Sequence, residues 1–181
     1  CIDFPAAYPE GYSSFYAMKY HITQSQYVDF LNCLPRAFQV LHVETDISGP
    51  TITNDFVMTN TSSIAAGNGI KCDTDIGYGN INFYCDRNDN GIQNESEGDG
   101  LGSSNNYMST YDWMAYLDWS GLRPMSFLEF EKAARGPLTP VPGEMSWGST
   151  LTTSAGTPLD NGTPTEAFSN STIDGGIRIT A

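Results

Sequence analysis

Residues 86–97 combine the residue types and the spacing of a calcium loop. Side chains that carry oxygen stand at loop positions one, three, five, nine and twelve, and Gly91 stands at position six. Calcium prefers many oxygen ligands, a glycine permits the sharp turn, and a final glutamate can bind through both carboxylate oxygens. The predicted role of a bound Ca2+ is to order a long loop. With position seven included, the predicted metal ligands are Asp86, Asn88, Asn90, Ile92, Asn94 and Glu97.

Two features separate this loop from an EF-hand. Ile92 occupies position seven, whereas the apolar residue of an EF-hand is expected at position eight, and no helix is predicted on either side. An alternative interpretation needs no metal: Asn90 and Gly91 form a hairpin turn, in which both central residues have positive φ. Asp99 can contribute to the loop in either case.

The rest of the chain lacks the motifs of common catalytic sites. No phosphate-binding glycine loop, HExxH, CxxC or GxSxG pattern occurs, and the acidic residues are scattered without a pair that could act as acid and base. His21 ends a predicted strand and His42 lies in an apolar run, so both are predicted to be structural. No catalytic residue is therefore predicted.

Four cysteines, at positions 1, 33, 72 and 85, are too few for a disulfide scaffold. Cys72 and Cys85 flank a loop that a disulfide could close, and the sequence does not decide whether this disulfide forms. Cys33 is predicted to be a buried thiol. Cys1 is either a lipid-bearing residue or an internal residue of a longer chain, and the second reading is preferred.

The composition limits the classes of function. The 181 residues include 21 acidic and 8 basic side chains, for a net charge of −13, so binding of nucleic acid by phosphate neutralisation is excluded. No apolar stretch approaches the ~20 residues of a transmembrane helix. This balance favours an extracellular or cell-surface protein. Sequons at Asn60, Asn94, Asn161 and Asn170 arise easily by chance in such a composition and do not establish glycosylation.

Three helices are predicted from capping boxes, in which a Thr or Ser cap and the residue three positions later bond each other's main chain. The pairs are Thr23 and Gln26, Ser109 and Asp112, and Ser126 and Glu129. Their apolar faces are predicted to be core, and Pro35, Gly121 and Gly136 end them. Short strands are predicted at 15–20, 38–44 and 80–85. The expected fold is a loop-rich α+β domain.

Three segments have the order and spacing of one known family. Residues 15–32 combine a strand, Lys-Tyr, a threonine cap and an aromatic-rich helix. Residues 113–136 combine a helix ending in Trp-x-Gly-x-Arg with a serine-capped helix ending in Ala-Ala-Arg-Gly, and Trp-Gly follows at 147–148. Together they resemble formylglycine-generating enzyme, or sulfatase-modifying factor, domains.

The resemblance implies an irregular variant of the C-type-lectin-like fold, with a small antiparallel sheet and about three short helices. Residues 1–181 are then a single domain, incomplete at its C-terminus, with an insertion at about 45–105 like that of bacterial surface and secreted members. The paired redox cysteines, the Gly-Asn-x-Trp-Glu segment and the Arg-Gly-Gly-Ser-Trp segment of the family's enzymes do not occur here. His21 also replaces a usual acidic residue, and no catalytic residue is carried over.

Three functions follow as hypotheses. The first is a non-catalytic extracellular module, stabilised by calcium, that binds a protein partner or self-assembles at the cell surface. The second is a fragment of a formylglycine-generating oxidase that acts on a protein cysteine. The third is a carbohydrate-binding lectin-like module, suggested by fold analogy alone.

Overall fold

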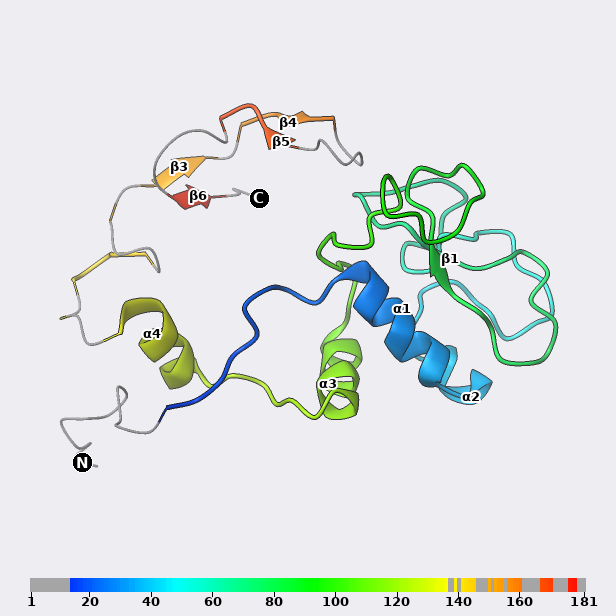
Figure 1. Ribbon diagram of the computed structural model, residues 1–181, viewed down its shortest axis with the longest axis horizontal. Coiled ribbons are helices and arrows are strands. Elements are labelled where there is room, and N and C mark those ends of the chain that lie inside the picture. Colours follow the sequence, from blue (N-terminus) through cyan, green and yellow to red (C-terminus); the bar gives the residue numbers. More distant parts are fainter. Residues whose placement is uncertain are drawn as a thin grey trace. The chain divides into compact units, whose positions relative to one another are not determined.

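A computed structural model describes residues 14–136, 139, 141–145, 150, 152–154, 156–160, 167–170 and 176–178. The described part mixes helices and short strands, as predicted, and includes a small antiparallel sheet (Figure 1). The chain divides into two compact units, each described by itself below. The larger unit is Tyr20–Arg123 with Leu159–Glu166, and the smaller is Cys1–Lys19 with Pro124–Pro158 and Ala167–Ala181.

The three helices predicted from capping boxes are all present. α1 spans Gln24–Cys33, α3 spans Thr110–Trp119 and α4 spans Phe127–Arg135. Each follows its predicted Thr or Ser cap, and both hydrogen bonds of each capping box are formed. These bonds satisfy main-chain N–H groups that have no partner within a helix. The local sequence therefore determines where each helix begins.

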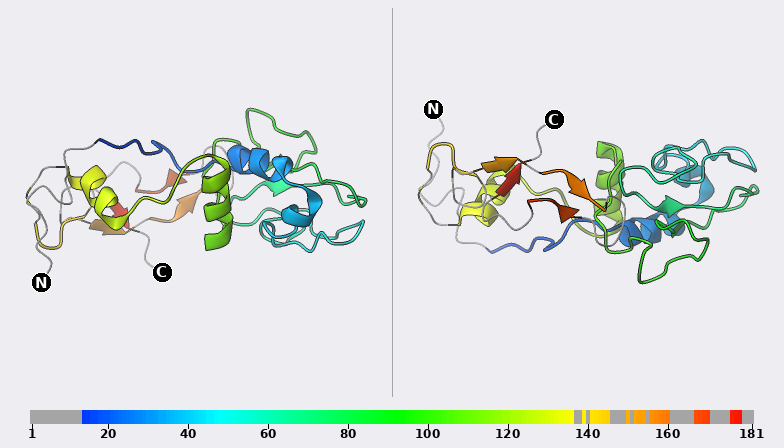
Figure 2. Two further views of the ribbon diagram at one scale, coloured as in Figure 1. Left: turned by 90° about the horizontal axis from the view of Figure 1, so that it is seen from below. Right: turned by 90° about the horizontal axis from the view of Figure 1, so that it is seen from above.

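In the larger unit, α1 packs against α3 and against a two-stranded antiparallel sheet. β1 (Ile70–Lys71) pairs with β2 (Tyr84–Cys85), with Lys71 opposite Tyr84. In both views of Figure 2 the loops between α1 and α3 gather around this sheet. Burial of each large apolar side chain contributes roughly 1.5–3 kcal/mol. The core includes Tyr27, Phe30, Leu31, Ile47, Val57, Ile70, Phe83, Tyr116 and Leu117.

Two of the predicted strands are wrong. Residues 15–18 take no regular structure, and no described strand pairs with the segment 15–20. Within 38–44, the chain instead completes a short helix, α2 (Arg36–Gln39), and then turns. The cause is Pro35, whose carbonyl accepts the N–H groups of Phe38 (2.8 Å) and Gln39 (3.1 Å). Of the third predicted strand, 80–85, only the last two residues form β2.

Side-chain amides, rather than strands, bond much of the main chain around β2. The fully buried Gln39 donates to the carbonyls of Leu31 (3.1 Å) and Ile81 (2.9 Å) and accepts the N–H of Ile81 (2.9 Å). Asn32 likewise donates to the carbonyl of Phe83 (3.0 Å) and accepts its N–H (2.8 Å). These bonds hold the segment before β2 against α1 and α2.

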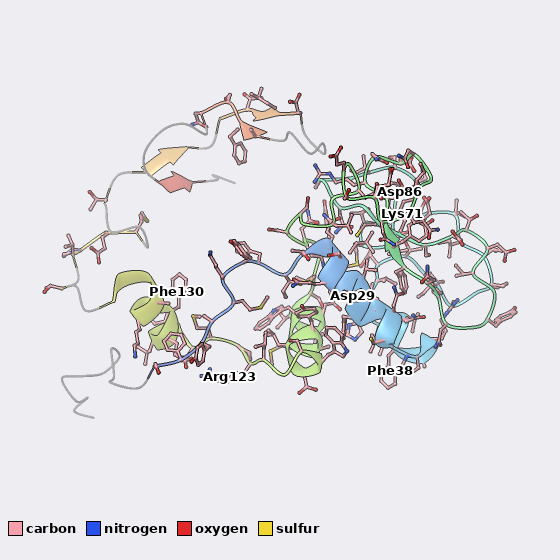
Figure 3. All side chains as sticks on the ribbon, viewed as in Figure 1. Asp29, Phe38, Lys71, Asp86, Arg123 and Phe130 are labelled. Carbon is pink, nitrogen blue, oxygen red and sulfur yellow. The ribbon has the colours of Figure 1, made fainter. Side chains whose placement is uncertain are left out.

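In the smaller unit, β3 (Thr152–Ser154) pairs in parallel with β6 (Gly176–Arg178). β4 (Pro158–Leu159), whose second residue is assigned to the larger unit, pairs with β5 (Ala167–Phe168). The predicted core face of α4 is wrong for Phe127 and Phe130, which are 73% and 51% exposed (Figure 3 labels Phe130). The strands described in this unit have two or three residues, too few to cover a helix face. The burial of Ala134 lies outside the described residues.

We expect Gln39→Leu to lower the free energy of unfolding by about 2–4 kcal/mol, because the N–H and the carbonyl of Ile81 lose their partner and the Leu31 carbonyl keeps only the N–H of Leu34. Urea denaturation measures the change. The matched control is Gln93→Leu, at an exposed position, which should change stability by less than about 0.5 kcal/mol. Equal stability of the two variants would contradict the role given to the Gln39 amide.

Candidate functional site

Asp86 directly follows β2, and its buried carboxylate organises the next turn. Its two oxygens accept the N–H groups of Asn90 (3.0 Å) and Gly91 (3.3 Å). Asn88 also accepts the N–H of Asn90 (3.1 Å), and Asn90 accepts that of Ile92 (2.7 Å). The oxygens at loop positions one and three therefore converge on the same N–H group, that of Asn90.

This turn is not the hairpin of the alternative interpretation. The left-handed residues are Asp89 (φ 56°) and Gly91 (φ 81°), whereas a type I′ turn requires positive φ at both Asn90 and Gly91. The loop is also not an EF-hand, as predicted, because β2 precedes it and no helix of the described chain lies between β2 and α3.

The later predicted ligands are used differently or lie in solvent. Asn94, with φ 58°, accepts the N–H of Cys85 (2.9 Å) and donates its own N–H to the Cys85 carbonyl (2.8 Å). Its side chain thus closes the loop against β2. Glu97 is exposed, and Ile92 is 57% exposed. Of the predicted ligands, Asp86 and Asn88 meet at the N–H of Asn90, whereas Asn94 bonds β2 and Glu97 lies in solvent.

Asp99 is the most unusual carboxylate of the site. It is fully buried, and one of its oxygens accepts the N–H of Glu95 (2.5 Å), while the other has no hydrogen-bond partner among the described residues. Burial raises the pKa of Asp99, and the negative charges of Asp86 and Glu95 raise it further. Glu95 in turn accepts a hydrogen bond from the Asn90 amide (2.6 Å). An unpaired buried carboxylate is costly unless a cation or a proton completes it.

Gly98 brings the Asp99 segment against the first turn of the loop. Its φ of 100° favours glycine, and a Cβ there would lie 2.3 Å from the Asn88 amide nitrogen. Within the described residues, no group of three or more His, Cys, Asp or Glu side chains is arranged to hold a metal ion. A calcium site here therefore needs amide or main-chain oxygens as well as carboxylates, which is ordinary for this ion.

One positive charge in the site comes from Lys71 on β1, which sequence reasoning missed. Its ammonium lies 2.5 Å from Asp89, 3.1 Å from Asp55 and 3.4 Å from Asp86, and 4.7 Å from the centre of the Phe56 ring. Figure 3 shows Lys71 beside Asp86. Burial lowers the pKa of Lys71, but Asp89 and Asp55 outweigh burial and raise it overall. No spacing signal exists for Lys71, because strand pairing alone brings it to the loop.

The histidines differ in environment. His42 bonds Asp112 through Nδ1 (2.8 Å) and packs its ring edge-on against Phe30 at 5.4 Å between centres, contacts that are consistent with the predicted structural role. Asp112 also accepts the N–H of Ser109, so this contact ties the cap of α3 to the turn after α2. His21 is exposed.

Cys72 and Cys85 are buried free thiols, and the strand register explains why they are not bridged. Ile70 lies opposite Cys85, so Cys72, two residues further along, lies diagonally across from Cys85. Diagonal neighbours on paired strands are farther apart than a disulfide spans. Burial raises the pKa of both thiols to about 12. Cys33 is exposed, so its predicted burial is wrong. Cys1, Asn161 and Trp147 with Gly148 lie outside the described residues.

Comparison of the chain with protein-family models, with curated proteins and with solved structures found no match. None of the helices in the described part of the chain combines the length and the apolar character needed to cross a membrane.

We expect iodoacetamide at pH 8 to modify Cys33 at least ~100-fold faster than Cys72 or Cys85, because a buried thiol with a raised pKa stays protonated. Mass spectrometry of a Cys1→Ser protein locates the modified residue. Cys33→Ser is the control and should remove the fast reaction. After denaturation without reductant all three thiols should react; a single reactive thiol would mean that Cys72 and Cys85 form a disulfide.

Proposed function

We propose that this chain is a non-catalytic extracellular or cell-surface module that binds a protein partner or a second copy of itself, and that Ca2+ stabilises its loop 86–99. The observation that carries the proposal is the unpartnered oxygen of the fully buried Asp99. A hard cation satisfies such an oxygen, and the neighbouring carboxylates and amides are the ligands that calcium prefers.

The proposed ligand set keeps Asp86, Asn88 and Asn90 and the main-chain carbonyl of Ile92 from the sequence prediction. Asp99 replaces Asn94, because the side chain of Asn94 is directed to the main chain of β2. Glu97 remains a candidate ligand because its carboxylate is exposed and can turn toward the loop. Bound calcium would supply structural order and no reaction step.

The resemblance of residues 15–32 and 113–136 to formylglycine-generating enzyme domains supports a C-type-lectin-like fold and a place among bacterial surface and secreted proteins. For the oxidase alternative, Cys72 and Cys85 offer no nucleophile, because buried thiols with raised pKa react poorly. A glycan is the alternative ligand of a module with this fold.

We expect calcium to stabilise the protein by about 2–3 kcal/mol when its free concentration is about 100 times Kd, and EDTA to remove this gain. Asp99→Asn should abolish the response. It should also raise Tm in EDTA, because it removes an unpaired buried charge, whereas loss of a merely structural residue would lower Tm. Thermal denaturation with and without calcium provides both readouts.

Asp118→Asn, at an exposed position on α3, is the matched control and should keep the full calcium response. Glu97→Gln tests loop position twelve separately, and a lost response there would add this residue to the ligands. If neither calcium nor EDTA changes the Tm of the wild-type protein, the metal site is refuted.

A further inference from the structure

Lys71 supplies a positive charge at the position-one residue of the calcium loop. Its ammonium and the N–H of Gly91 share the same oxygen of Asp86, at 3.4 and 3.3 Å. Lys71 is 6% exposed and Asp86 is 1% exposed, so water screens their interaction poorly. Any cation that binds Asp86 is therefore repelled by the ammonium of Lys71.

We propose that Lys71 is an internal cation that holds the loop in its folded shape without calcium and lowers its affinity for calcium. This inference rests on the proposed calcium site and describes how that site is regulated. Lys71 comes from β1, whose pairing with β2 keeps it next to Asp86 whether or not a metal is present.

The distances indicate how both cations can be accommodated. Asp86 makes the longest of the three carboxylate contacts of Lys71, at 3.4 Å, against 2.5 Å for Asp89 and 3.1 Å for Asp55. Neither Asp89 nor Asp55 belongs to the proposed ligand set. Calcium binding at Asp86 would therefore break the weakest of these contacts, and the ammonium would remain paired with two carboxylates.

The same contacts explain how the loop keeps its folded conformation without a metal. Asp89 has a left-handed backbone, with φ 56°, a conformation that aspartate adopts more readily than most residues other than glycine. Its short contact with Lys71 ties this residue to β1, and Asp86 bonds the main chain on the far side of the turn. Removal of the ammonium leaves Asp55, Asp86 and Asp89 to repel one another until another cation binds.

The test compares Lys71→Met with wild type by isothermal titration calorimetry with CaCl2. We expect Kd for calcium to fall at least ~10-fold in the variant, because the repulsion between the two cations is lost. In EDTA, amide hydrogen exchange over residues 88–92 should be at least ~10-fold faster in the variant, and calcium should restore protection.

Two controls separate charge from packing. Lys71→Arg keeps the charge and should keep Kd within about threefold. Lys132→Met removes the same charge from α4, where the ammonium lies 5.6 Å from the centre of the Phe15 ring, and should leave Kd unchanged.

The outcomes distinguish this inference from the calcium proposal. If wild type binds calcium and Lys71→Met binds it equally or more weakly, the role of Lys71 is refuted and the calcium site stands. Binding by the variant alone supports the role of Lys71 and refutes calcium binding by the natural chain. Binding by neither protein refutes both. A Lys71→Met protein that stays unfolded even in saturating calcium also overturns the inference, whereas folding on addition of calcium supports it.

Discussion

The larger unit depends on one constraint: buried main-chain N–H and C=O groups must be hydrogen-bonded, although the chain between α1 and α3 forms little sheet. Side-chain amides on the helices meet this demand. Gln39 and Asn32 bond the main chain before β2, and Gln24 donates to the carbonyl of Gly67 (2.9 Å) and accepts the N–H of Gly69 (2.8 Å) next to β1. Gln24 near the start of α1 thus holds the chain before β1, and Asn32 near its end holds the chain before β2. These bonds set the positions of Lys71 and Asp86.

Buried charged groups in the loop that follows β2 also need partners. The buried carboxylate of Asp86 is satisfied by two N–H groups and by an ammonium, while the buried Asp99 lacks a partner for one oxygen. Buried charges persist only when they are paired, hydrogen-bonded or bound to a metal. The contrast between these two aspartates is the physical basis for proposing a cation at Asp99, whereas Asp86 already has Lys71 as its counter-ion.

The accuracy of the sequence predictions follows the range of the interactions behind them. The capping boxes at Thr23, Ser109 and Ser126 involve residues three positions apart, and all three form. The strand predicted at 38–44 fails because the carbonyl of Pro35 starts a helix instead. The predicted core face of α4 fails at Phe127, because a face is buried only if another element covers it.

The sequence by itself determined the helix starts, the acidic balance and the run of oxygen-bearing residues at 86, 88 and 90, because each depends on composition or on spacing within one turn. Only the tertiary structure decided which oxygens share a site. Asn94 turns to the main chain of β2, Asp99 is buried with one oxygen unpartnered, and Lys71 reaches Asp86 across paired strands. Contacts between residues distant in sequence depend on packing and register, which local spacing does not encode.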